Sequence, residues 1–212
     1  MTQRAARAGA PQRPPRTVRR DAVRNHQRIL DAAHEVLSES GADAGMEEIA
    51  ARAGVGVGTV YRRFASKGAL IDELLRLAVE QLLMAAERAL ARTDGRGLED
   101  LLRAIGQSFA DHARYANLML ERHTDPSASL RVRAAIGELT ARAAAAGLVD
   151  PATSSGDILA LVWAMRGLVQ SSQEMPADAW QRFLDIHLAG LRTAPPANGT
   201  RAKSSTPAMP SP

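Results

Sequence analysis

The sequence predicts an all-α protein in which an N-terminal helix-turn-helix domain is joined by one long helix to a C-terminal helical domain. Aromatic residues make up only 3% of the 212 residues. Ala, Leu, Arg and Glu dominate between Gly and Pro breaks, a composition that favours helices over sheets. Apolar residues also recur at the i, i+3, i+4, i+7 spacing of amphipathic helices. With 45% hydrophobic residues, the chain can bury the core of one or two domains.

Composition also bounds the function. The sequence contains no cysteine, which excludes a disulfide framework, Cys-zinc sites and a thiol nucleophile and is compatible with a reducing cytosol. The N-terminus is rich in Arg and has no apolar signal region, and no stretch reaches the roughly 18 apolar residues of a membrane span. We therefore expect a soluble, cytoplasmic protein with no membrane partner.

The formal net charge of +4 is unevenly distributed. Residues 1–67 contain 12 Lys and Arg against 7 Asp and Glu, whereas residues 68–192 contain 13 against 16. Such a polarity directs the basic end toward a polyanion and makes binding dependent on salt.

Residues 1–22 are predicted to form a disordered arm, because they contain almost nothing apolar that could pack. The arm carries six arginines, namely Arg4, Arg7, Arg13, Arg16, Arg19 and Arg20. Two interpretations stay open: an arm that lies along phosphates or in a minor groove, or a solvated leader with only non-specific attraction to DNA. From about Asp21 to Gly41, apolar residues at helical spacing predict the first helix.

The segment from Met46 to Lys67, MEEIAARAGVGVGTVYRRFASK, predicts a helix, a tight turn and a second helix. The first helix buries one face, formed by Met46, Ile49, Ala50 and Ala53. Gly54 is the expected left-handed residue that ends this helix, and Gly56 lets the chain reverse.

The second helix, 57–64, has Val60 and Phe64 facing inward. Its outward residues, Gly58, Thr59, Tyr61, Arg62 and Arg63, combine a small residue for close approach with groups that can reach phosphates and base edges, and no acidic side chain. A nucleotide-binding glycine loop would instead need a preceding hydrophobic strand and a following Lys-Ser/Thr pair or GxGxxG spacing, and none is present. A plain solvated surface is the remaining alternative.

The run AxxAGVGVGTVYRRFASKGALIDELL resembles the DNA-binding end of the TetR (tetracycline repressor) family. The resemblance is close over residues 24–75 and absent, as sequence, beyond about residue 80. It implies that 57–64 is the recognition helix and that Lys67, at the start of the next helix, lies against a phosphate. Two positions depart from the family pattern: Gly56 replaces a Ser that caps the recognition helix, and Met46 replaces a Thr. Met46 in place of Thr removes an expected contact with the DNA backbone, and Arg63 is a candidate to replace that contact.

The rest of the chain is predicted to be helical. After Ser66, a plausible N-cap, one helix of about 25 residues reaches the break at 93–95 and spans roughly 35 Å. Further helices are predicted over 98–113, 115–122, 129–146, 155–172 and 177–192. The predicted domains are 23–70 for DNA binding and 71–193 for ligand binding and dimerisation, with a disordered tail over 194–212.

The last two helices are the most apolar part of the chain, and a helix that is apolar nearly all round needs cover on both sides. A second copy of the chain can supply that cover through a four-helix bundle, which agrees with the dimers typical of the family that the chain resembles. The predicted dimer interface contains Leu161, Val162, Met165, Phe183 and His187.

An effector pocket is implied by the resemblance. Its candidate lining consists of the large or polar residues of the middle helices, Phe109, His112, Tyr115, Met119, His123, Trp163 and Arg166, although residues of these types are more often plain core or surface. No metal site is expected, because His112 and His123 lack the spacing of a metal motif.

These observations favour a dimeric, ligand-responsive transcriptional regulator, by resemblance a repressor, that binds a palindromic double-stranded operator and is released by an unknown small molecule. A non-specific nucleoid-type DNA-binding protein is the alternative. An enzyme is less favoured, because the sequence offers no nucleophile-base set, no catalytic residues, no metal ligands and no cofactor loop.

Overall fold

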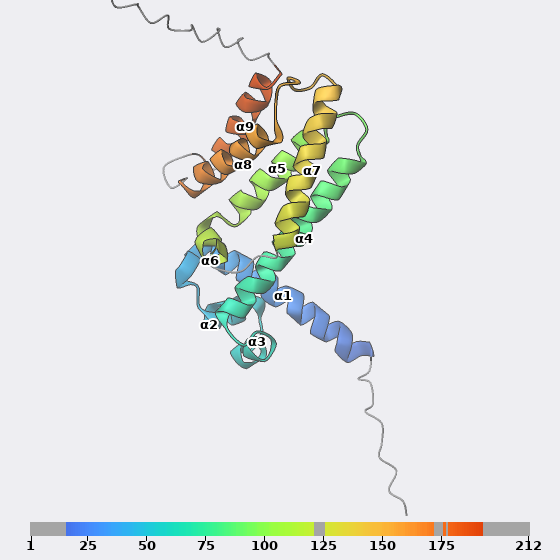
Figure 1. Ribbon diagram of the computed structural model, residues 1–212. Helices are drawn as coiled ribbons and strands as arrows, with labels where there is room; N and C mark the ends of the chain where they lie inside the picture. The colour runs from blue at the N-terminus through green and yellow to red at the C-terminus, as the bar shows by residue number, and fades with distance from the viewer. Residues whose placement is uncertain (1–15, 121–125, 172–175, 177, 193–212) are drawn as a thin grey trace, which may run out of the picture. The chain divides into compact units, whose positions relative to one another are not determined.

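The structure is a computed structural model that describes residues 16–120, 126–171, 176 and 178–192. All regular elements in these residues are helices, as predicted (Figure 1). They are α1 (Arg16–Ser40), η1 (Gly41–Asp43), α2 (Met46–Ala53), α3 (Val57–Arg63), α4 (Lys67–Ala91), α5 (Gly97–Asp111), η2 (Ala113–Tyr115), α6 (Ala116–Leu120), α7 (Pro126–Ala145), α8 (Ser155–Gln170) and α9 (Ala179–Gly190). No described helix is long and apolar enough to cross a membrane.

The chain divides into two compact units. The N-terminal unit comprises Met1–Arg76 and Arg114–Arg122, and the C-terminal unit comprises Leu77–Ala113 and His123–Pro212. This division differs from the predicted ranges 23–70 and 71–193, because the first break falls after Arg76 within α4 and because the segment from Arg114, with α6, belongs to the N-terminal unit. Tyr115 is only 1% exposed there, and its hydroxyl lies 2.7 Å from Nδ1 of His34 in α1.

In the N-terminal unit, α1 packs on α2 through buried apolar side chains such as Ile29, Val36 and Ile49. The helix begins at Arg16 rather than near Asp21. No Gly or Pro occurs between Pro15 and Gly41, so nothing in the sequence stops the helix from starting directly after the proline. The predicted arm therefore overlaps α1, while residues 1–15 and the predicted tail lie outside the described residues.

The C-terminal unit buries one hydrophobic core among α5, α7, α8, α9 and the second half of α4. Leu101, Ile136, Ile158 and Leu184 are fully buried in it. Gly106 of α5 lies beneath the ring of Trp180, where a Cβ atom would stand 2.4 Å from the nearest ring carbon. The absence of a side chain at residue 106 is therefore what lets α9 approach α5.

Candidate DNA-binding surface

The turn between α2 and α3 depends on Gly54. Its φ of 66° and ψ of 37° are left-handed, and the N–H groups of Gly54 and Val55 donate to the carbonyls of Ala51 and Ala50 at 3.1 and 3.0 Å. These two bonds satisfy carbonyls at the end of α2 that would otherwise lack partners. The predicted role of Gly54 is confirmed.

Helix α3 begins without a side-chain cap. Gly56 at its N-cap is extended, and its carbonyl accepts from the N–H of Thr59 at 2.7 Å. Val60 and Phe64 are buried, so the predicted inward face is confirmed. They anchor α3 and leave the opposite side of the helix to solvent.

The outward face of α3 is small, polar and basic. A Cβ atom added to Gly58 would meet nothing within 4 Å, and the Tyr61 side chain is 46% exposed. The guanidinium of Arg62 donates from Nη2 to Oγ1 of Thr59 at 2.9 Å. A backbone open at Gly58, a phenol and a guanidinium thus share one short helix that contains no carboxylate.

Two of the predicted contact residues have partners that the sequence did not indicate. Arg63 donates from Nε to Nδ1 of His26 at 2.8 Å, and Lys67 donates from Nζ to the carbonyl of Ala42 at 2.5 Å. These partners lie 37 and 25 residues away in the chain. No local pattern could have paired them, because spacing rules describe neighbours within one helix only.

Side-chain contacts fix the helices that flank α3. Arg52 of α2 pairs with Glu35 and Glu39 of α1 at 3.3 and 2.7 Å, which raises the pKa of Arg52 and lowers that of Glu39. These pairs are exposed, so they align α2 on α1 but contribute little to stability. At the start of α4, Oγ of Ser66 accepts from the N–H of Ala69 at 3.1 Å, the predicted cap.

The predicted effector-binding residues are divided between the two units. Tyr115 and Met119 are buried in the N-terminal unit, whereas Phe109 of α5 and His112, the C-cap of that helix, belong to the C-terminal unit. Trp163 is 57% exposed on α8, with the Arg166 guanidinium 5.4 Å from its ring centroid. His123 lies outside the described residues.

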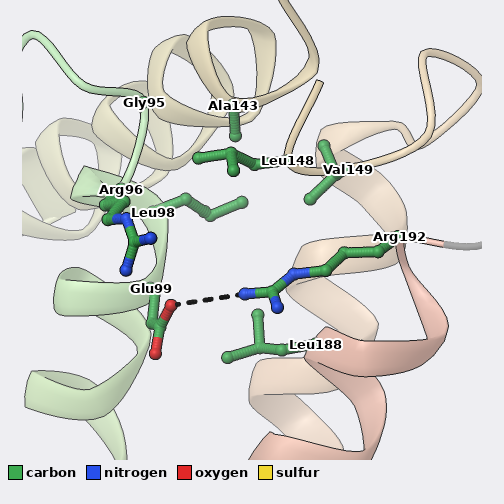
Figure 2. Close-up of a pocket in the computed structure, with 9 residues that line it drawn as sticks. All are labelled: Gly95, Arg96, Leu98, Glu99, Ala143, Leu148, Val149, Leu188 and Arg192. Carbon is green, nitrogen blue, oxygen red and sulfur yellow. Dashed lines mark ion pairs between the residues drawn. The ribbon is translucent and has the colours of Figure 1, made fainter. Parts of the chain in front are cut away.

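A pocket in the C-terminal unit lies where α5 begins and α7 and α9 end (Figure 2). Leu98, Leu148 and Leu188 give it apolar walls, and the pair between Glu99 and Arg192, at 3.8 Å, lies at its side. None of the predicted effector residues lines it. Its free volume is about 20 Å³, which is space for roughly one water molecule.

The predicted dimer residues divide into two groups. Leu161 and Met165 are buried in the core of the C-terminal unit itself, which corrects their expected position on an outer seam. Val162 and Phe183 are half-buried and His187 is exposed.

Ile186, which the sequence analysis did not select, is 59% exposed. Trp163 and Ile186 are each two positions from a buried core residue, and thus about 200° around the helix from it.

A left-handed glycine turn followed by a short helix with a basic, carboxylate-free outer face defines a helix-turn-helix protein of the DNA-binding class. The family model described as "Bacterial regulatory proteins, tetR family" matches residues 29–74. A TetR transcriptional regulator from Streptomyces coelicolor, SCO0520, is 31% identical, with a TM-score of 0.60 over 78% of this chain and 97% of that one. A TetR regulator from Mycobacterium vanbaalenii is 30% identical, with a TM-score of 0.62 over 83% and 99%. The chain belongs to the TetR family of transcriptional regulators.

Curated relatives match over a shorter stretch. The HTH-type transcriptional regulator SAR0097 of Staphylococcus aureus is 33% identical over 121 residues, which are 54% of this chain and 63% of that regulator. Further regulators of the same species match over 54 residues, 29% of their length. The chain thus spans less than two thirds of these curated relatives. They are transcriptional regulators rather than enzymes, in agreement with the sequence analysis.

Proposed function

We propose that this regulator binds a palindromic double-stranded DNA operator as a homodimer, with α3 of each protomer in the major groove. The observation that carries the proposal is the outward face of α3. A helix with an open backbone at Gly58, and with Thr59, Tyr61 and Arg62 beside it, matches the width and chemistry of a major groove. Because its partner is genomic DNA, we propose that it works in the cytoplasm.

The side chains of this face divide into two proposed roles. Tyr61, Arg63 and Lys67 hold phosphates and set the register of the protein on the duplex. Thr59 and Arg62 read base edges, and the bond of 2.9 Å between them aligns the Arg62 guanidinium for a bidentate contact. Lys67 can keep its bond to Ala42 while it contacts a phosphate, because an ammonium group has three donors.

Substitutions on α3 test this division. We expect Tyr61→Ala to weaken binding to all sequences alike, because a phosphate contact carries no sequence information. Arg62→Ala should instead relax the preference for one base pair by about 1–3 kcal/mol. Fluorescence anisotropy on a duplex selected by the wild-type chain from a random pool, and on a random-sequence duplex, measures both effects. Arg133→Ala, at an exposed position of α7, is the control.

Two results would contradict the assignment. If Tyr61→Ala and Arg62→Ala both bind like the control, α3 is not the reading helix. If wild type binds selected and random duplexes equally at every salt concentration, the protein is a non-specific DNA-binding protein, because a specific regulator keeps a large affinity ratio.

We further propose that DNA binding represses transcription and that a small molecule releases it. Family membership supports this part of the proposal. A pocket for a drug-sized ligand needs about 300 Å³ or more, far above the roughly 20 Å³ of free space between α5, α7 and α9. An effector of that size does not fit this pocket as it stands. Phe109 of α5 and the C-cap of that helix, His112, remain proposed lining residues in the C-terminal unit.

A further inference from the structure

His26 of α1 lies where three helices of the N-terminal unit meet. Its ring stacks on Phe64, directly after α3, with centroids 5.4 Å apart and planes inclined by 22°. Nδ1 lies 2.8 Å from Nε of Arg63, and Nε2 lies 3.5 Å from Oε1 of Glu73 in α4. One imidazole therefore contacts the end of the recognition helix with its face and with one nitrogen.

The contact with Arg63 fixes the protonation state of the ring. Arg63 is always protonated at Nε, so Nδ1 of His26 has to act as the acceptor. The ring is then neutral, and its proton is on Nε2, which faces Glu73. The charged groups that face His26 are Arg63 from α3 and Glu73 and Arg76 from α4. Burial and the nearby Arg63 lower the pKa of His26 from 6.5, although Glu73 opposes them, so this neutral form prevails at pH 7.

The same contact leaves most of the Arg63 guanidinium available. The Arg63 side chain is exposed, and no group within the described residues accepts from either of its Nη atoms. An arginine that is held only at Nε keeps two parallel donors for a phosphate, with less side-chain freedom to lose on binding.

We propose that His26 is a positioning residue for DNA binding, whose neutral imidazole holds Arg63 by Nε and presents both Nη groups to a phosphate. This inference rests on the proposed function. It also makes the Arg63 contact sensitive to pH. A protonated ring carries a donor at Nδ1, so it repels Nε–H of Arg63 and releases the side chain.

A double-mutant cycle tests the positioning role in the full-length chain. His26→Phe keeps an aromatic ring against Phe64 but removes the acceptor. Arg63→Ala should weaken binding to the selected duplex. The factor by which it weakens binding should be about three- to tenfold smaller in the His26→Phe background, the range expected for pre-ordering one long side chain. Equal loss in both backgrounds would show that His26 only supports the fold, and would overturn the inference.

A pH series separates positioning from packing. The affinity ratio between wild type and the Arg63→Ala variant should fall as pH drops from about 8 to about 5.5, across the titration range of histidine. His26→Asn places a carboxamide oxygen where Nδ1 stands and cannot take a proton, so the same ratio measured in the His26→Asn background should stay constant. Taking ratios cancels the titration of the other histidines. A ratio that is constant with pH in the chain that keeps His26 would contradict the proposal.

The failure of the proposed function gives a different result. If Arg63→Ala binds DNA like wild type while Tyr61→Ala does not, Arg63 makes no contact and the inference on His26 falls, whereas α3 stays the reading helix. If neither substitution matters, the DNA-binding surface itself is misassigned.

Discussion

At the scale of single residues, the absence of a side chain at Gly54 sets the geometry of the turn. Its left-handed φ of 66° strains any L-residue, and an added Cβ would stand 2.7 Å from Nη2 of Arg28. We expect Gly54→Ala to lower the free energy of unfolding by about 1–2 kcal/mol. Urea unfolding followed by circular dichroism measures the change.

Gly137 in α7 provides the matched control. It is helical, and an added Cβ would meet nothing within 4 Å. Gly137→Ala should therefore stabilise the chain by about 0.5–1 kcal/mol. Equal unfolding midpoints for the two variants would show that the backbone of the turn tolerates a side chain, and that its geometry does not need glycine.

At the scale of elements, the start of α8 couples helix stability to pH. Ser154 and Asp157 form a capping box: Oγ of Ser154 accepts from the Asp157 N–H at 3.2 Å, and Oδ2 of Asp157 accepts from the Ser154 N–H at 2.8 Å. The hydrogen bonds from Ser154 lower the pKa of the Asp157 carboxyl below 3.8. A lowered folded-state pKa means that the ionised carboxylate contributes stability above the unfolded-state pKa, and that this contribution is lost as pH falls through the folded-state value.

Asp157→Asn tests this linkage. The variant should unfold at lower temperature than wild type at pH 7, because a carboxylate is a better acceptor than an amide at a helix N-terminus. The gap should close as pH falls below the unfolded-state value of about 4. Thermal melts at a series of pH values would show it. A gap that is constant down to acid pH would mean that the charge of Asp157 does not stabilise α8.

Boundaries set by local signals were predictable from the sequence. Helix α2 covers the predicted residues because Gly54 ends it, and α4 runs from Lys67 for the predicted 25 residues because Ser66 caps it. The segment after α5 was predictable as a short helix but not as part of the N-terminal unit. Tyr115 is placed there by a contact with His34, 81 residues away in the chain, and no helical periodicity reports such a contact.

The same limit applies to the candidate site. The outward face of α3 follows from one rule, that residues four apart share a face, so Tyr61 and Arg62 could be selected from the sequence. The neighbours of Arg63 and Lys67 are brought in from α1 and from the Ala42 carbonyl by tertiary packing. His26 therefore gave no sequence signal, although its ring touches both Arg63 and Phe64.

At the scale of the whole molecule, the apolar character of α8 was predictable from the sequence. Which of its apolar residues lie in the core of the C-terminal unit was not. Leu161 and Met165 fill its own core, so a charge there would test folding rather than assembly. The large apolar side chains left exposed on α8 and α9 are Trp163 and Ile186. Substitutions at these two residues, rather than at the buried pair, therefore test the proposed dimer without emptying the core.

We expect Trp163→Glu and Ile186→Glu each to convert a dimer into folded monomers, because either would bury a carboxylate in an apolar interface at a cost of several kcal/mol. Leu130→Glu is the control, since Leu130 is 66% exposed on α7 of the same unit but lies outside α8 and α9. Light scattering gives the assembly state, and circular dichroism checks that the helices persist.

Two recognition helices read half-sites roughly 34 Å apart only if a dimer links them. The monomeric variants should therefore lose roughly a hundredfold or more in affinity for the selected duplex, although α3 is unchanged. A monomeric wild type, or a Trp163→Glu chain that binds the selected duplex as tightly as the Leu130→Glu control, would contradict assembly through α8 and α9.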